Sequence, residues 1–383
     1  MPSKRRDILW DAEPHTIAKI TILEAYLHAW FQIMGRSMAG KDILYIDGFA
    51  GPGEYTNYPK GSPIAALNSA REVLRLSEGQ WKAGTIHCAF IETDEERFNH
   101  LQKVIEQLTG INRVKIHLLN STFTEGLKQL RSEIPGAFRE SWPLFVFIDP
   151  FGATGAPFSV VAEILQSPYA EVLINFDADG IIRIFRAKEK ANSDVLLNEI
   201  FGNDEWKTAL TGIRDFIPQC LQVLNLYKQN LRRLPNIRYE FAFEMRSRSR
   251  SLNYYLVFAS QHYLGLEKMK EAMKKVDQTG DYHFSDAHVN QQTLFRFDKP
   301  ENSSHLMFAR FEGKVVQYDE LRDFALNETP FINPKGMLKD LENKDLITVS
   351  SRDPQRRKGT FNEENIIKIT FKGGEYSAHK DKN

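Results

Sequence analysis

The sequence predicts an α/β protein whose main sheet is mostly parallel. Short apolar segments such as ILYID at residues 43–47 and EVLINF at residues 171–176 alternate with segments of helical periodicity. The apolar segments show almost no alternation of polar and apolar residues, which is typical of strands that helices cover on both faces. Polar residues and glycines follow several of these segments, and ligands bind at that position in such sheets.

The first expected element is a long amphipathic helix. Residues 14–36 place Ile17, Ile20, Leu23 and Leu27 at steps of three and four. That spacing gathers the apolar side chains on one helical face. We assign residues 1–40 to an N-terminal helical extension.

Strands and helices are then expected to alternate. The expected strands are residues 43–47, 88–92, 114–119, 143–149 and 171–176. The expected helices between them are residues 63–76, 94–109, 123–132 and 157–166. A helical, charged stretch at residues 180–235 separates these from a further strand at residues 253–260, which we expect to pair with residues 291–297. This α/β domain covers residues 41–300, with a helical insertion near residues 180–240.

The C-terminal residues show a different pattern. Two short helical segments, within residues 315–329 and 334–349, precede a hairpin at residues 347–371. Two helices followed by a β wing are typical of the winged helix, a variant of the helix-turn-helix. We place this domain at residues 305–372 and a flexible tail at residues 373–383.

Composition limits the possible partners and locations. The 50 Lys and Arg residues balance the 50 Asp and Glu residues, so contact with nucleic acid would require local basic patches. The two cysteines, Cys88 and Cys220, are too few for a disulfide framework or a four-thiolate zinc site, and suit a reducing compartment. No apolar run reaches the length of about 18 residues that a membrane helix needs. We therefore expect a cytoplasmic protein without a membrane span.

A glycine-rich loop follows the first strand. It contains Asp47, Gly48, Phe49, Ala50, Gly51 and Gly53. Glycines let the backbone approach a ligand and the acid accepts hydrogen bonds from it, although the same pattern occurs in ordinary turns. No Gly-Lys-Ser/Thr follows, which argues against a phosphate-binding P-loop. Glu92, at the end of the second strand, favours a ligand, because an acid at that position binds ribose hydroxyls in doubly wound folds.

Two further strand ends carry candidate catalytic residues. Asp149, Pro150 and Phe151 end the fourth strand, where a carboxylate and an aromatic ring can hold a flat base; the alternative is a simple strand-ending turn. His262 follows the strand at residues 253–260 and is either a general base or a helix cap. His283, Asp286 and His288 are close in sequence but lack a distant further ligand, so we assign no metal site.

Basic residues concentrate around the expected wing. They are Lys335, Lys339, Arg352, Arg356, Arg357 and Lys358. Such a cluster can neutralise several phosphates of DNA or RNA at once. The alternative is an ordinary solvated surface, because acidic residues are interspersed among them.

Several motifs together resemble the three-Cys-motif partner protein family, over about residues 15–372. The motifs are YIDGFAGPGEY, GSPIAAL, FIETDEERF, FIDPFGATG and YYLVFASQHYLGLEKMK. Residues 1–180 also resemble class I S-adenosylmethionine-dependent methyltransferases, particularly those that act on adenine in nucleic acid. The fourth motif departs from their pattern, because it reads Asp-Pro-Phe-Gly instead of Asp-Pro-Pro-aromatic. The third strand ends in NSTF, where the related enzymes often carry an acid for the adenine of the cofactor.

The resemblance implies a Rossmann-like class I methyltransferase fold with a C-terminal winged helix. It implies S-adenosylmethionine as cofactor, with residues 47–53 along its methionine part, Glu92 on its ribose, and residues 149–151 facing the methyl acceptor. It also implies a companion, a radical S-adenosylmethionine-type protein with three cysteines, whose cluster this chain with two cysteines cannot hold. Two hypotheses result: a methyltransferase acting on nucleic acid, or a non-catalytic nucleic-acid-binding partner that retains the methyltransferase scaffold.

Overall fold

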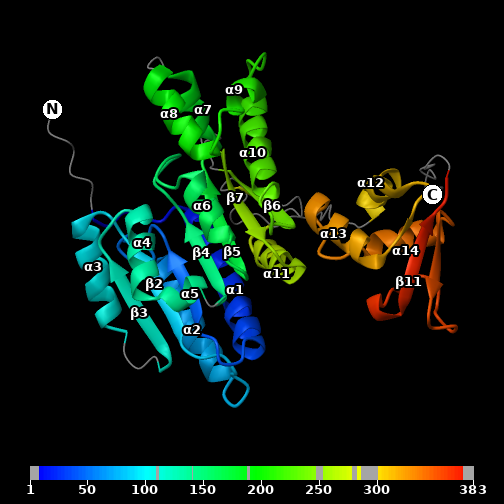
Figure 1. The fold of residues 1–383 in the computed structure, drawn as a ribbon, viewed down its shortest axis with the longest axis horizontal. Helices are drawn as coiled ribbons and strands as arrows, with labels where there is room; N and C mark the ends of the chain where they lie inside the picture. The colour runs from blue at the N-terminus through cyan, green and yellow to red at the C-terminus, as the bar shows by residue number, and fades with distance from the viewer. Residues whose placement is uncertain are drawn as a thin grey trace. The chain divides into compact units, whose positions relative to one another are not determined.

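The chain forms two compact units in a computed structural model. The structure describes residues 8–108, 112–139, 141–187, 190–246, 253–277, 283–285 and 301–373. The smaller unit contains residues 301–373, and the larger contains the other described residues (Figure 1). Within the described residues, no helix has both the length and the apolar character needed to cross a membrane.

An eight-stranded sheet forms the centre of the larger unit. Its strands are β1 (Ile43–Asp47), β2 (Ile86–Ile91), β3 (Val114–Leu119), β4 (Leu144–Ile148), β5 (Ala170–Phe176), β6 (Tyr239–Arg246), β7 (Asn253–Ser260) and β8 (His283–Ser285). They lie in the order β3-β2-β1-β4-β5-β7-β6-β8. The first five are parallel, whereas β7 runs antiparallel to both β5 and β6. The order reverses between β1 and β4, which creates a crevice at their carboxyl ends.

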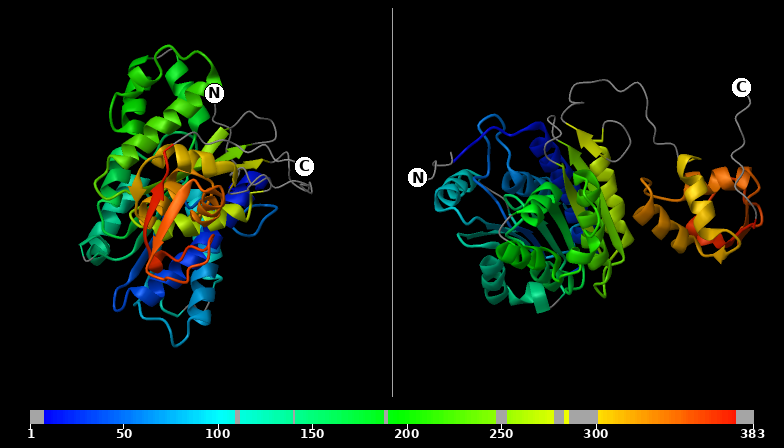
Figure 2. Two further views of the ribbon diagram at one scale, coloured as in Figure 1. Left: turned by 90° about the vertical axis from the view of Figure 1, so that its right-hand side faces the viewer. Right: turned by 90° about the horizontal axis from the view of Figure 1, so that it is seen from above.

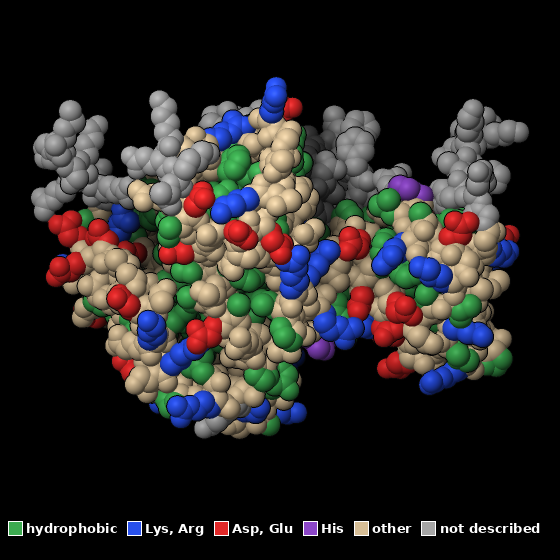
Figure 3. Space-filling view, turned by 45° about the horizontal axis from the view of Figure 1, so that its top comes forward, with side chains coloured by type: hydrophobic (Ala, Val, Ile, Leu, Met, Phe, Trp, Pro, Cys, Tyr) green, Lys and Arg blue, Asp and Glu red, His purple; other side chains and the backbone are tan. Residues whose placement is uncertain are grey.

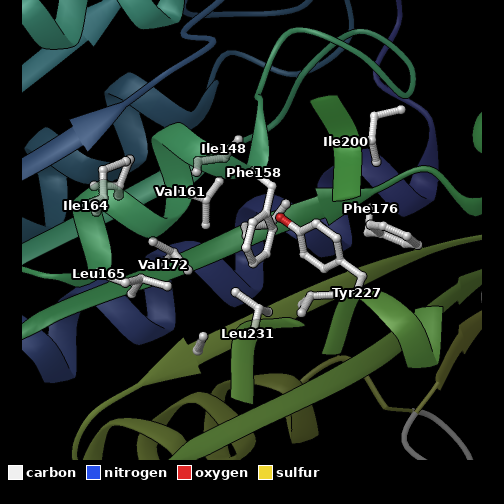
Figure 4. Packing of buried hydrophobic residues seen from close by; sticks show 14 of the residues in the cluster. Ile148, Phe158, Val161, Ile164, Leu165, Val172, Phe176, Ile200, Tyr227 and Leu231 are labelled. Atoms are coloured by element: carbon white, nitrogen blue, oxygen red, sulfur yellow. The ribbon is translucent and has the colours of Figure 1, made fainter. Parts of the chain in front are cut away.

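Helices cover both faces of this sheet (Figures 1 and 2). They are α1 (Pro14–Ser37), α2 (Ser62–Leu76), α3 (Glu95–Glu106), α4 (Phe123–Glu133), α5 (Pro135–Arg139), α6 (Phe158–Leu165), α7 (Ala178–Arg186), α8 (Lys190–Phe201), α9 (Trp206–Ala209), α10 (Phe216–Arg232) and α11 (Tyr263–Lys274). On one face, residues of α4, α6, α7 and α10 pack against alternate strand residues such as Leu44 and Val146. Figure 4 shows part of this core, where Phe158 lies beside Tyr227. Burial on both faces explains the near-continuous apolar strands.

Helix α1 belongs to the core of the larger unit. Leu23, Tyr26 and Trp30 on its apolar face are almost completely buried. The Tyr26 ring packs against Phe145 of β4, with their centroids 4.9 Å apart. The structure therefore packs α1, which lies within the expected extension, onto the sheet, because its apolar face covers residues that would otherwise be exposed to water.

Strand β6 was not expected from the sequence. The strand contains Glu240 and Glu244, which interrupt the apolar run that marks the other strands. Glu240 is buried at the sheet, where it pairs with Lys228, at 3.4 Å, and with Arg232 of α10. The expected pairing of residues 253–260 with 291–297 is wrong, because β5 and β6 occupy the two edges of β7. Residues 291–297 lie outside the described residues.

The smaller unit combines three helices with a short sheet. Its elements are α12 (Glu301–Phe311), β9 (Val315–Val316), α13 (Tyr318–Glu328), α14 (Lys335–Asn343), β10 (Ile347–Ser351) and β11 (Ile366–Phe371). Strand β11 lies between β10 and β9 and is antiparallel to both. A separate core that includes Leu321, Leu338 and Ile369 holds these elements together. The expected helices and the β10–β11 hairpin are present.

Removing apolar volume from α1 should destabilise the larger unit. We expect Leu23→Ala, at a fully buried position, to lower the free energy of unfolding by about 2–5 kcal/mol, because it leaves a cavity in the core. Leu76→Ala, at a half-exposed leucine of α2, should change it by less than about 0.5 kcal/mol. Urea unfolding of both variants measures the difference. Equal, small effects would show that α1 is dispensable to the fold.

Candidate functional site

A pocket of about 330 Å³ lies at the carboxyl ends of β1, β4 and β5. This volume is within the range of small-molecule sites. Its lining comes from the loop after β1, the ends of β4 and β5, the first turns of α1, and the segment before α1. Segments that are distant in sequence therefore meet at the crevice that the strand order creates.

The loop after β1 presents its backbone to this pocket. Gly51 and Gly53 have φ values of 62° and 90°, in the left-handed region that glycine adopts without strain. A Cβ atom at Gly51 would meet no atom within 4 Å, so this part of the loop borders open space. Gly48 has a different role, because a Cβ there would lie 2.6 Å from the Phe123 ring. The pocket lining starts at Phe49, and Asp47 and Gly48 lie behind it.

Asp47 is a buried carboxyl group at the end of β1. Its Oδ1 accepts a hydrogen bond from the Phe49 backbone N–H at 3.3 Å, and its Oδ2 has no hydrogen-bond partner of normal geometry among the described residues. Burial raises the pKa of Asp47 to about 7, against the lowering effects of the Ser62 side chain and the Phe49 N–H. Burial therefore favours the protonated form of Asp47 compared with an exposed aspartate.

Glu92 holds the glycine loop in place. One carboxylate oxygen accepts the backbone N–H of Gly51 at 2.9 Å, and the other accepts that of Asp94 at 2.8 Å. A further bond, from the Ala50 N–H to the Ile91 carbonyl, ties the same loop to β2. Glu92 is nearly buried and does not line the pocket, so its visible role differs from the ribose contact that the resemblance implies.

Asp149 forms a hydrogen-bonded ion pair inside the pocket. Its Oδ2 lies 2.5 Å from Nζ of Lys19, on α1, and its Oδ1 accepts a bond from Nδ2 of Asn175 at 2.7 Å. All three residues line the pocket. The sequence analysis missed Lys19, although a signal existed: the lysine continues the apolar stripe of Leu23, Tyr26 and Trp30 by one turn.

Aromatic side chains line the mouth of the pocket. Phe151 is 63% exposed, and its ring centroid lies 5.6 Å from that of Trp10. Tyr55 also contacts Trp10, with the same centroid separation. The Arg97 guanidinium lies 4.8 Å from the Trp10 centroid and 5.0 Å from that of Phe151. Pro150 also lines the pocket, as expected, whereas Trp10 and Tyr55 were not predicted.

Backbone and side-chain bonds hold Trp10 in this position. The segment before α1 bonds to the loop after β1, since the Ala12 N–H donates to Asn57 Oδ1 at 2.7 Å and the Thr56 N–H donates to the Trp10 carbonyl at 3.1 Å. Contacts between segments so distant in sequence leave no local pattern, which explains why Trp10 was missed.

His262, a candidate catalytic residue, does not line the pocket that contains Asp149, because it lies near the opposite end of the parallel strands. Strand β7 is antiparallel to β5, so its last residue, Ser260, pairs with Glu171 at the start of β5. The residue that follows β7 is thereby directed away from the carboxyl ends of β1 and β4. His262 caps α11, and its Nδ1 accepts the Leu264 N–H at 3.2 Å. The alternative interpretation, a helix cap, is confirmed.

Two of the six expected nucleic-acid-binding residues have acidic partners. Arg356 donates to both carboxylate oxygens of Glu342, at 2.8 and 2.9 Å, and is mostly buried. Lys358 pairs with Asp345 at 2.8 Å. The other four are exposed and form no ion pair within the described residues: Lys335, Lys339, Arg352 and Arg357. On the face that Figure 3 shows, basic and acidic side chains are interspersed, in agreement with the balanced composition. Asp286 and His288 lie outside the described residues.

Comparison with solved structures finds partial similarity to methyltransferases. An O-methyltransferase from Bacillus cereus in complex with SAH is 14% identical, with 65% of this chain and 82% of that chain covered and a TM-score of 0.33. Trm1 from Pyrococcus horikoshii with S-adenosyl-L-methionine is 8% identical, with 72% of this chain and 62% of that chain covered and a TM-score of 0.34. A putative O-methyltransferase from Klebsiella pneumoniae is 11% identical, with 66% of this chain and 92% of that chain covered and a TM-score of 0.32. No protein-family model and no curated protein matches the sequence. These similarities are too low to transfer site residues or activity.

The raised pKa of Asp47 predicts a pH-dependent effect of Asp47→Asn. Between the unfolded pKa of about 3.9 and the folded value of about 7, the folded chain keeps a proton that the unfolded chain has lost. Wild-type stability therefore falls as pH rises through this window, by at most about 1.4 kcal/mol per pH unit. The asparagine variant should gain stability relative to wild type between pH 5 and 7 in urea unfolding. A difference that does not change with pH would contradict the assigned cause.

Proposed function

We propose that this chain is an S-adenosylmethionine-dependent methyltransferase that acts on nucleic acid. One juxtaposition supports the proposal most directly. The glycine loop after β1 and Asp149 at the end of β4 line one pocket at the point where the strand order reverses. That is where a doubly wound sheet binds a ligand, and the two strand ends can hold a cofactor and an acceptor side by side.

The residues around the glycine loop fit the methionine end of S-adenosylmethionine. Open space borders Gly51, and the carboxylates of Glu54 and Asp177 line the pocket, where they suit an ammonium group. Glu92 would support the cofactor indirectly. Its carboxylate accepts the Gly51 backbone N–H at 2.9 Å and so fixes the loop, and it would make no direct contact with the ribose. When bound, the cofactor supplies a methyl group on a positively charged sulfur.

The remaining pocket residues would position the acceptor. Lys19 and Asn175 fix the carboxylate of Asp149 through bonds of 2.5 and 2.7 Å, so that its direction is set before the acceptor arrives. The Phe151 ring, which is 63% exposed at the pocket, offers an aromatic surface where a base can stack. Catalysis in such a site comes mainly from positioning and electrostatics.

The smaller unit is proposed to bind nucleic acid as a winged helix. Its order of helices followed by a β10–β11 hairpin fits that motif, and four exposed basic side chains on α14 and the hairpin have no acidic partner within the described residues. The motif resemblance further supports the proposal that the protein works with a three-Cys-motif radical S-adenosylmethionine-type protein.

A second candidate is a non-catalytic nucleic-acid-binding partner that retains the methyltransferase scaffold. Both oxygens of Asp149 already accept bonds, and so do both oxygens of Glu92. Satisfied carboxylates of this kind also occur where a former site has a purely structural role. Cofactor binding separates the two candidates.

Calorimetry with S-adenosylmethionine and its demethylated product tests the cofactor site. We expect micromolar affinity for the full chain, weakened by roughly tenfold in Glu54→Gln, because a charge-assisted hydrogen bond to the ammonium is lost. Glu125→Gln, at an exposed glutamate of α4, is the matched control and should bind like wild type. Absence of binding at millimolar ligand would support the non-catalytic scaffold instead.

The salt dependence of nucleic-acid binding tests the smaller unit. Arg352→Ala and Arg357→Ala should each weaken binding of the full chain and reduce the slope of log K against log salt by roughly 1, because each removes one phosphate contact. Arg75→Ala, at an exposed arginine of α2, should leave the slope unchanged. Fluorescence anisotropy at several salt concentrations gives the slopes. Identical slopes in all variants would refute the proposed interface.

A further inference from the structure

The ion pair between Lys19 and Asp149 bears on the identity of the methyl acceptor. The two side chains are only 11% and 22% exposed, respectively, yet both line the pocket. Nζ of Lys19 also lies 5.7 Å from the centroid of the Tyr254 ring. Removing a lysine ammonium from water is costly, and a single carboxylate partner recovers only part of that cost. The cost of burying this ion pair indicates that it has a role in the pocket beyond stabilising the fold.

The pair offers a hydrogen-bond donor and an acceptor to the same ligand group. A lysine ammonium has three donors and no acceptor, whereas a carboxylate accepts through about four lone-pair positions. Asp149 uses one position on each oxygen, for Lys19 and Asn175, and retains capacity for a further donor. A ligand group that contacts both Lys19 and Asp149, beside their direct ion pair, must therefore accept from the ammonium and donate to the carboxylate.

A hydroxyl group satisfies this requirement, and an exocyclic base amine does not. The hydroxyl oxygen can accept from Lys19 while its proton points to Asp149. An amine on a base only donates, and its nitrogen becomes cationic as it receives the methyl group. The Lys19 ammonium would oppose that charge, whereas it would stabilise the negative charge that develops on a hydroxyl oxygen.

We propose that the acceptor is the ribose 2′-hydroxyl of RNA, with Lys19 and Asp149 as catalytic residues. This inference rests on the proposed methyltransferase function. Within an internal nucleotide the 3′ and 5′ oxygens are esterified, so the 2′ position carries the free hydroxyl, and that hydroxyl distinguishes RNA from DNA. The exposed Phe151 ring at the pocket suits the unstacked base of the same nucleotide.

The reaction at this pair balances without a further reactant. The acceptor oxygen forms a bond to the methyl carbon, and the bond from that carbon to the cofactor sulfur breaks with its electron pair remaining on sulfur. The hydroxyl proton passes to the Asp149 carboxylate and then to water. Lys19 donates to the acceptor oxygen throughout, which orients a lone pair toward the methyl carbon.

Methyl transfer to matched RNA and DNA tests the proposal. The probes are short single-stranded RNA of random sequence and DNA of the same design, incubated with full-length protein and methyl-labelled cofactor, then digested and analysed by mass spectrometry. We expect 2′-O-methyl nucleosides from RNA and no transfer to DNA. Lys19→Met should lower the rate by roughly 100-fold or more, as loss of a group acting at the reacting atom does.

A matched lysine variant controls for the loss of an ion pair. Lys60 forms an ion pair of 2.7 Å with Glu24 of α1 and does not line the pocket. Lys60→Met removes this ion pair and should leave the rate of methyl transfer unchanged. Anisotropy with the same two polymers and the demethylated cofactor adds a readout without turnover: wild type should prefer RNA, and Lys19→Met should lose that preference. If the methionine variant does not fold, Lys19→Arg keeps a cation beside Asp149 and should fall roughly tenfold in rate, because its N–H groups lie at different positions.

The outcomes separate this inference from the proposed function. A labelled methyl on a base nitrogen, or equal labelling of RNA and DNA, would overturn the hydroxyl acceptor and leave the methyltransferase function intact. An unchanged rate and RNA preference in Lys19→Met would overturn the role of Lys19. Cofactor binding without transfer to either polymer would overturn both proposals, and absence of cofactor binding would overturn the methyltransferase function itself.

Discussion

The reversal of strand order between β1 and β4 is the constraint on which the site depends. The carboxyl ends of parallel strands lie on the same side of the sheet, and the chain leaves β1 and β4 toward opposite faces. The space between the two departing loops becomes the pocket that holds Gly51 and Asp149. Because helices bury both faces of these strands, the edge of the sheet is where polar side chains can collect without a large desolvation cost.

Helix α1 connects the stability of the fold to the chemistry of the site. The same helical stripe that packs Tyr26 against Phe145 carries Lys19 to Asp149 two turns earlier. The stripe thus passes from the apolar core to the polar pocket within two turns. The segment before α1 reinforces this arrangement, because Ala12 donates a hydrogen bond to Asn57 and the same segment places Trp10 in the pocket lining.

Acidic residues in the larger unit have two kinds of role that their sequence positions do not distinguish. Glu92 and Asp149 both follow a strand of the parallel sheet. The oxygens of Glu92 are directed to backbone N–H groups and stiffen the glycine loop, whereas Asp149 faces the pocket with Lys19. The difference arises from the neighbouring backbone, which turns back over Glu92 at Gly51 and leaves Asp149 accessible.

The sequence alone determined the α/β class, the parallel strands β1 to β5, helices α13 and α14 with the β10–β11 hairpin, and the glycine loop with Asp149 as a candidate site. Local periodicity and turn residues encode these features. The sequence did not predict α12. Only the tertiary structure placed β6 next to β7 and His262 near the amino-terminal ends of the parallel strands. It also paired Arg356 with Glu342 and brought Lys19 and Trp10 to the pocket. These outcomes depend on strand direction and on contacts between distant segments, which no local pattern records.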